Sequence, residues 1–269
     1  MQARLTETLA QCRARGEKAM GIFVTNGFPE PSATLDILHA IDQNGADFIE
    51  LGMPFSDPLA EGLPIQHSSE RAIRQGVKMA DAFTVVRAFR ETSQTPLLLM
   101  GYYNPILRYG LEKFCHDAAE SGVDGLILPD LPPDEAASLQ AFAERYGLAW
   151  VNLIAPNTSN ERVSFVDAQT NGFVYAVSVT GLTGTAISTD AVSAYLARVR
   201  PLVRRNPLLV GFGIKSYQDA HRLTEHTDGY IVGSALIRVL EELWDASGLP
   251  HAERLAAIGT FIHQLKYGT

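Results

Sequence analysis

Residues 19–51 read AMGIFVTNGFPEPSATLDILHAIDQNGADFIEL, and this stretch decides the fold. Residues 19–24 and 48–51 are nearly continuous in apolar side chains, which is typical of parallel strands covered on both faces. Between them, apolar residues recur with helical spacing over residues 33–41, and Gly45 follows as a helix-ending signal. Because parallel strands need a crossover connection, the stretch predicts one strand–helix–strand unit.

The same alternation continues to the end of the chain. Further apolar runs occupy residues 96–100, 125–128, 148–153, 173–177, 208–210 and 229–232. Helical patterns occupy residues 82–89, 111–119, 135–146, 160–168, 191–203, 217–223 and 235–243. Eight such units predict an α/β fold, a single (β/α)8 TIM barrel, with an extra N-terminal helix and an extra C-terminal helix over residues 251–265. A doubly wound open sheet competes, but its G-x-G-x-x-G fingerprint after the first strand is missing.

Composition limits the classes of function. The chain has 269 residues, is 46% apolar and carries a formal net charge of −8. An acidic protein is a poor partner for nucleic acid. Cys12 and Cys115 form no C-x-x-C pair, and the histidine spacing supports neither a zinc site nor a Ser-His-Asp set. With no signal-peptide pattern, no membrane-length apolar run and no linker-like stretch, we expect residues 1–269 to form one cytoplasmic domain.

Two carboxylates stand near the end of the second apolar run. Glu50 lies inside that run, where desolvation raises a carboxyl pKa and suits it to proton transfer. The competing interpretation is an inward Glu50 paired with a buried Arg or Lys as structural support. Glu61 follows on a loop rich in Gly and Pro. If the two side chains share a pocket, they can divide the acid and base roles.

Glycines mark two further places at expected strand ends. Tyr175 lies in the sixth apolar run, and Gly181 and Gly184 follow it in what is either a flexible lid or an ordinary turn. Residues 211–215 (GFGIK) and 233–236 (GSAL) follow the seventh and eighth runs. Small residues before a helix offer free backbone N–H groups to an anion, and barrels commonly hold a phosphate between these two loops.

Residues 50–62, ELGMPFSDPLAEG, resemble the signature ELG-x-PFSDP-x-ADG of the tryptophan synthase alpha chain family. Other blocks resemble the family in the same order: residues 23–25, 100–106, 128–132, 175–184, 211–214 and 233–235. The resemblance implies a lyase that cleaves indole-3-glycerol phosphate to indole and glyceraldehyde 3-phosphate by a reversible retro-aldol reaction. It also implies that the indole passes to a β chain that uses pyridoxal phosphate (PLP), and that this chain needs no metal or organic cofactor.

The resemblance also assigns roles to residues. Glu50 would transfer protons, Glu61 would accept a hydrogen bond from the indole N–H, and Tyr175 would lie beside the substrate. The remaining substrate-binding positions are Phe23, Met100, Thr183, Gly184, Phe212, Gly213, Gly233 and Ser234, of which Phe23, Met100 and Phe212 line the indole slot. The positions expected to face the β chain in an α2β2 assembly are Pro54, Asp57, Asn104 and Pro132.

The sequence departs from the family pattern near the site. The family has Asp where this chain has Glu61, residues 62–65 read GLPI in place of G-P-x-I, and residues 185–188 lack the Arg of many relatives. An added methylene moves the carboxylate by about a bond length, and a misplacement of ~1 Å can cost about a hundredfold in rate. Two other readings therefore stay open: an impaired subunit that mainly activates a β chain, and a stand-alone lyase. Another phosphate-binding barrel enzyme, such as an epimerase, explains the ELG-x-PFSDP block poorly.

Overall fold

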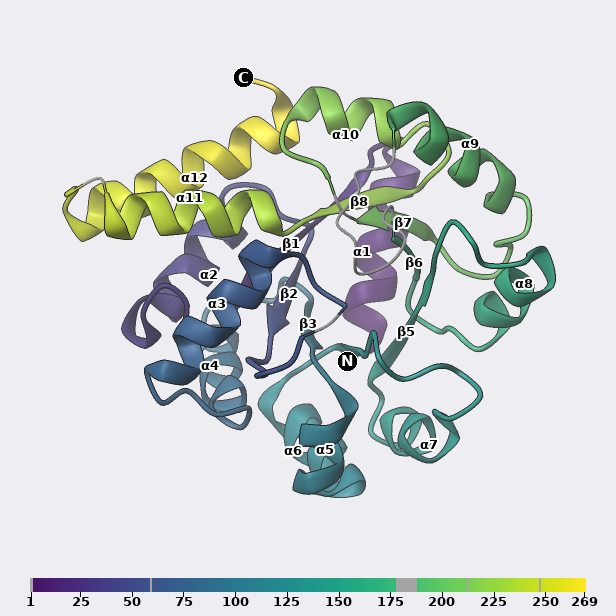
Figure 1. Cartoon of the computed structure of the whole chain (residues 1–269), viewed down its shortest axis with the longest axis horizontal. Helices are drawn as coiled ribbons and strands as arrows, with labels where there is room; N and C mark the ends of the chain where they lie inside the picture. The colour runs from purple at the N-terminus through teal and green to yellow at the C-terminus, as the bar shows by residue number, and fades with distance from the viewer. Residues whose placement is uncertain (1, 59, 178–187, 212, 247) are drawn as a thin grey trace.

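The computed structural model describes residues 2–58, 60–177, 188–211, 213–246 and 248–269. Within these ranges, eight parallel strands form a closed barrel in chain order (Figure 1). They are β1 (Ala19–Thr25), β2 (Phe48–Gly52), β3 (Leu97–Met100), β4 (Gly125–Ile127), β5 (Ala149–Ile154), β6 (Val174–Val177), β7 (Leu208–Gly211) and β8 (Gly229–Val232). The ring closes where β1 pairs with β8, in a register that places Ala19 beside Gly229. The predicted TIM barrel is confirmed.

Helices surround this barrel (Figure 1). They are α1 (Gln2–Ala14), α2 (Thr34–Gln43) after the short helix η1 (Pro31–Ala33), α3 (Leu63–Arg74), α4 (Asp81–Arg90), α5 (Tyr103–Tyr109), α6 (Leu111–Ser121), α7 (Ala137–Arg145), α8 (Asn160–Ala168), α9 (Thr189–Val199), α10 (Tyr217–Leu223), α11 (Ser234–Asp245) and α12 (His251–Tyr267). The predicted N- and C-terminal additions correspond to α1 and α12. Two helices, α3 and α5, were not predicted, and α9 ends before the expected residue 203 because Pro201 has no backbone N–H to continue the helical hydrogen bonds.

The barrel interior is filled by aromatic side chains from opposite strands. The rings of Phe48 on β2 and Phe173, next to β6, lie with their centroids 5.4 Å apart, and both are fully buried. Because β2 and β6 are four strands apart in the ring, these side chains meet through the middle of the barrel. Burying a side chain of this size stabilises the fold by about 1.5–3 kcal/mol.

The N-terminal ends of the strands are tied to α1. The carboxylate of the fully buried Asp124, just before β4, accepts hydrogen bonds from Arg4 Nε at 2.7 Å and Arg90 Nη2 at 2.6 Å. It also accepts one from the Leu97 backbone N–H at 2.8 Å. These contacts hold α1 at the N-terminal side of the barrel, so that the C-terminal ends of the strands are left for the site.

The two cysteines are not joined in a disulfide. Cys12 and Cys115 are free and buried, which is typical of cysteines that pack as small apolar residues. Of the helices described, none is long and apolar enough to cross a bilayer.

Candidate active site

Glu50 lies in β2 with its side chain directed into the barrel. Alternate residues of a strand share a face, so Glu50 lies on the same face as Phe48, which meets Phe173 in the interior. Glu50 is fully buried, and neither of its carboxylate oxygens has a hydrogen-bond partner among the described residues. Burial, and then the nearby Glu61 carboxylate, raise the pKa of Glu50 well above its usual value. The interpretation of Glu50 as one half of a buried ion pair is therefore wrong, and burial favours the protonated, neutral form of the side chain.

Glu61 lies in the loop between β2 and α3, and several hydrogen bonds fix that loop. The Glu61 backbone N–H donates to the Pro58 carbonyl at 3.0 Å, and Gln66 Nε2 donates to the Glu61 carbonyl at 2.8 Å. The Ala60 backbone N–H donates to Tyr102 Oη at 3.2 Å. Glu61 Oε2 is shielded from solvent and has no partner among the described residues, and burial raises the pKa of Glu61 to about 7. A small change in its surroundings therefore switches this carboxyl between its two protonation states near neutral pH.

Tyr175 lies in β6 on the same face as Phe173 and is 5% exposed. A Cβ atom on Gly211 of the neighbouring strand β7 would lie 2.3 Å from Tyr175 Oη, so the ring fits only because residue 211 is glycine. Burial, and then the carboxylates of Glu50 and Glu61, raise the pKa of Tyr175 well above its usual value. Its hydroxyl is therefore a neutral hydrogen-bonding group close to both carboxyls.

Glu61 and Tyr175 line a cavity of about 160 Å³ at the C-terminal end of the barrel. Its lining includes the sequence-predicted residues Phe23, Glu61, Met100, Tyr175, Gly213, Gly233 and Ser234. Glu50 is not part of the lining and lies beneath it in the core. Three further predicted positions, Thr183, Gly184 and Phe212, lie outside the described residues.

The cavity lining combines apolar walls with backbone donors. Phe23 and Met100 are buried apolar residues at the ends of β1 and β3. Gly233 precedes α11, and Ser234 is the first residue of that helix, so its unpaired N–H groups and positive dipole end face the cavity. Gly213 has a φ of +81°, a conformation that side chains with a Cβ rarely adopt. The arrangement can hold a flat apolar group together with an anion.

Sequence reasoning gave no individual role to several cavity residues, three of which lie in the two glycine loops that it named. They are Ile65, Ile214, Lys215, Ile231, Ala235 and Arg238. Ile65 was missed because it belongs to the unpredicted α3. A signal did exist for Lys215 and Arg238, since each is a cation that shortly follows one of the two glycine loops.

The residues expected at a partner interface follow three neighbouring strands. Asp57, Asn104 and Pro132 are exposed, whereas Pro54 is buried. They belong to the chain segments that follow β2, β3 and β4. The carboxylate of Asp130 accepts hydrogen bonds at 3.0 and 3.1 Å from the Tyr103 backbone N–H, and this ties the segment after β4 to the one after β3. The four positions thus lie on the side of the barrel where the cavity opens.

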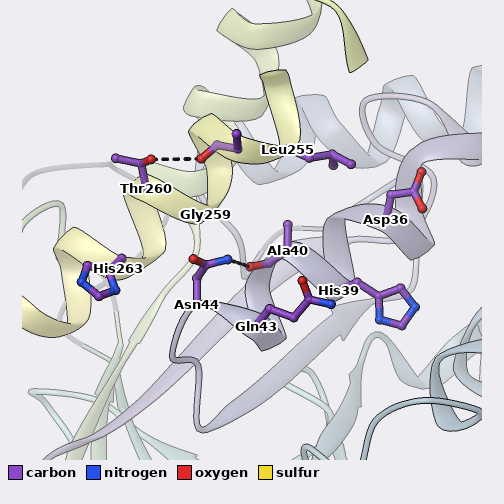
Figure 2. Close-up of a pocket in the computed structure, with 10 residues that line it drawn as sticks. Asp36, His39, Ala40, Gln43, Asn44, Leu255, Gly259, Thr260 and His263 are labelled. Carbon is purple, nitrogen blue, oxygen red and sulfur yellow. Dashed lines mark hydrogen bonds between the residues drawn. The ribbon is translucent and has the colours of Figure 1, made fainter. Parts of the chain in front are cut away.

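A larger pocket of about 570 Å³ lies on the outside of the barrel, between α2 and α12 (Figure 2). Its hydrogen bonds are local: Asn44 Nδ2 donates to the Ala40 carbonyl at 2.8 Å, and Thr260 Oγ1 donates to the carbonyl one turn earlier at 3.0 Å. His39 and His263 are on different helices and lie apart in Figure 2. Across the described ranges, no group of three His, Cys, Asp or Glu side chains could hold a metal ion. The chemistry is therefore concentrated in the smaller cavity inside the barrel.

Comparison with known proteins points to one family. Residues 9–264 match the family model described as tryptophan synthase alpha chain. The tryptophan synthase alpha chain of Geobacter sp. strain M21 is 41% identical over 267 residues, covering 99% of this chain and 97% of the relative.

Solved structures agree with this match. The tryptophan synthase subunit alpha of Legionella pneumophila strain Paris superposes with a TM-score of 0.89 at 38% identity, covering 98% of this chain and 97% of that one. A chain of the tryptophan synthase complex from Pyrococcus furiosus gives a TM-score of 0.81 at 38% identity, covering 92% and 97% of the two chains. This chain therefore belongs to the tryptophan synthase alpha chain family.

Proposed function

We propose that this chain cleaves indole-3-glycerol phosphate to indole and glyceraldehyde 3-phosphate. The observation that carries the proposal is Glu50, a fully buried carboxyl without a hydrogen-bond partner among the described residues, near the partly buried Glu61. A buried neutral acid close to an ionisable carboxylate is what a reaction needs when one proton is delivered and a cation is stabilised. The apolar walls and backbone donors of the adjoining cavity suit the indole ring and the phosphate.

In the first step, Glu50 donates its proton to C3 of the indole ring, and the ring becomes a cationic indolenine. Glu61, in its ionised form, accepts a hydrogen bond from the indole N–H and stabilises the positive charge that develops there. In the second step, the Glu50 carboxylate removes the proton from the glycerol hydroxyl next to C3. The electrons of that O–H bond form the aldehyde C=O, and the electrons of the breaking C–C bond return to the ring. Glu50 ends the cycle protonated, as it began.

Other residues would position the substrate. Phe23 and Met100 would pack against the indole ring, and Tyr175 would lie beside it within reach of both carboxyls. The phosphate would bind backbone N–H groups at Gly213, Gly233 and Ser234, at the positive end of α11. The same roles extend to Thr183, Gly184 and Phe212 by their place in the family pattern. Because proton transfer alone breaks the bond, this chain would need no cofactor of its own, and PLP would belong to the β chain.

A β chain is the proposed partner, in an α2β2 assembly. The relative from Pyrococcus furiosus was solved as a tryptophan synthase complex. In this chain the exposed Asp57, Asn104 and Pro132, together with the buried Pro54 beneath them, follow β2, β3 and β4 on the side where the cavity opens. A partner docked there would receive indole over a short path. We also propose that residues 1–269 act as one domain.

The test is the rate of indole formation from indole-3-glycerol phosphate, measured with and without a β chain. We expect cleavage that rises when the β chain is added, because the partner favours the closed state of the site. Glu61→Ala should lower the rate about a hundredfold. If the chain gives no indole under either condition, the proposal is wrong and an activating role would replace it. Full activity without a β chain would favour a stand-alone lyase.

A further inference from the structure

Two cations flank the glycine loops at the mouth of the barrel cavity. Lys215 follows β7 and Arg238 lies in α11, which follows β8, and both side chains are exposed. Both line the cavity together with Gly213, Gly233 and Ser234. Consecutive strand–helix units thus contribute the same pair of features, backbone donors and one positive side chain.

Neither cation has a polar partner among the described residues. Among the described residues, neither the Lys215 ammonium nor the Arg238 guanidinium forms a hydrogen bond or an ion pair. Of the two acidic residues one turn beyond Arg238, Glu241 pairs with His67 at 3.0 Å, and Glu242 forms no ion pair with Arg238 among the described residues. These cations are therefore free to meet a ligand.

The position of Arg238 favours an anionic ligand. Arg238 is the fifth residue of α11, near the helix end that already carries partial positive charge. A cation near a helix N-terminus is unfavourable, whereas an anion bound there satisfies both the helix end and the cation. A phosphate monoester carries about −1.5 to −2 charges at pH 7. A chain of net charge −8, with the ionisable Glu61 at the same cavity, would otherwise repel this part of the proposed substrate.

We propose that Lys215 and Arg238 form a two-cation clamp that binds the phosphate of the substrate from the solvent side. The clamp rests on the proposed function and deepens it, because it names side chains that select a dianionic ligand over a neutral one. The backbone donors fix the position of the phosphate, and the clamp supplies charge. Because the phosphate is remote from the breaking bond, the clamp contributes to binding in the ground state and the transition state alike, and so lowers KM without changing kcat.

The experiment compares Lys215→Gln, Arg238→Gln and the double variant with the unaltered protein and with Arg13→Gln. Arg13 is an exposed arginine on α1, at the other side of the barrel, and serves as the matched control for loss of one positive charge. Calorimetric titration with glycerol 3-phosphate and with indole measures binding directly. Steady-state cleavage of indole-3-glycerol phosphate with a β chain gives KM and kcat separately.

Each single substitution should weaken glycerol 3-phosphate binding about threefold to tenfold, and the double variant more. Indole binding and kcat should stay within about twofold, Arg238→Lys should recover part of the loss, and 0.5 M salt should reduce the difference between proteins. The clamp is overturned if the double variant binds glycerol 3-phosphate as tightly as the unaltered protein, or if Arg13→Gln weakens it equally. If the unaltered protein neither binds glycerol 3-phosphate nor cleaves the substrate, the proposed function fails and the clamp fails with it. If the unaltered protein cleaves the substrate normally and the double variant binds glycerol 3-phosphate equally well, the clamp is refuted and the proposed function stands.

Discussion

Replacing Glu50 with glutamine should make the protein more stable and nearly inactive. Glu50 is fully buried without a hydrogen-bond partner among the described residues, and its pKa is raised well above the ordinary value of 4.5. Below pH 4.5 the carboxyl is protonated in both the folded and the unfolded chain, so it adds no pH dependence. Above pH 4.5 the unfolded chain releases this proton while the folded chain retains it, so rising pH favours unfolding.

The size of the stability change follows from the linkage between proton binding and folding. Each pH unit costs about 1.4 kcal/mol while Glu50 stays protonated in the folded state. Between pH 5 and pH 7 the loss reaches at most about 2.5 kcal/mol, the full value applying while Glu50 stays protonated in the folded state, after allowing for partial protonation of the unfolded chain near pH 5. Glutamine has nearly the same shape and cannot ionise, so Glu50→Gln removes the loss. It also removes the proton donor, which should lower kcat about 10²- to 10⁴-fold.

The assay is urea unfolding of both proteins at pH 5, 6 and 7, together with the rate of indole formation. The free energy of unfolding of Glu50→Gln, relative to the unaltered protein, should rise steadily with pH. Glu120→Gln, which alters an exposed glutamate on α6, should change it by less than about 0.5 kcal/mol at every pH. A difference that is constant with pH would refute the reasoning, because it would mean that Glu50 is ionised in the folded protein.

Three further predictions concern the site and its support. Burial raises the pKa of Glu61 to about 7, so kcat/KM should rise about tenfold per pH unit below pH 7 as this carboxyl ionises. The pH–rate profile of Glu61→Gln should lack this rise. Gly211→Ala would place a Cβ 2.3 Å from Tyr175 Oη and should cut kcat/KM at least tenfold; unchanged kinetics would show that the ring moves without consequence. Arg4→Ala removes one of two cations from the buried Asp124 and should cost about 1–3 kcal/mol in urea unfolding at pH 7, and a loss below about 0.5 kcal/mol would contradict this.

The strands were predictable because each is a short, apolar run buried on both faces, and all eight predicted runs overlap the strands of the described barrel. Helix α3 escaped prediction because part of its buried face is polar. Ser68 and Ser69 are buried there, and Ser68 Oγ lies 2.6 Å from Thr25 Oγ1 and donates to the Ile65 carbonyl at 2.7 Å. Ile65 and Ala72 are the apolar residues buried on this helix, and two positions are too few to stand out as an apolar helical pattern. Helix α5 is only seven residues long and buries Ile106 alone.

The candidate site was predictable where residue type and position were both unusual. Glu50 is a charged residue inside an apolar strand, and the two glycine loops repeat in consecutive units. The protonation state of Glu50 was not predictable, because it depends on whether a distant Arg or Lys reaches it, and only the fold answers that. Lys215 and Arg238 were not predicted because neither their residue type nor their position is unusual. Exposed cations on helices and loops are common, and only their shared cavity distinguishes these two.

The seam between β1 and β8 makes the cavity depend on closure of the barrel. Phe23 comes from the first strand, while Gly233, Ser234 and Arg238 follow the eighth, so these walls meet only when some two hundred residues of intervening chain are in place. Contacts this distant in sequence form slowly and late. A substrate that contacts both Phe23 and the loop after β8 therefore binds the closed ring and not the open one, and its binding energy is added to the stability of closure. Bound substrate would thus stabilise the closed barrel in addition to undergoing the reaction.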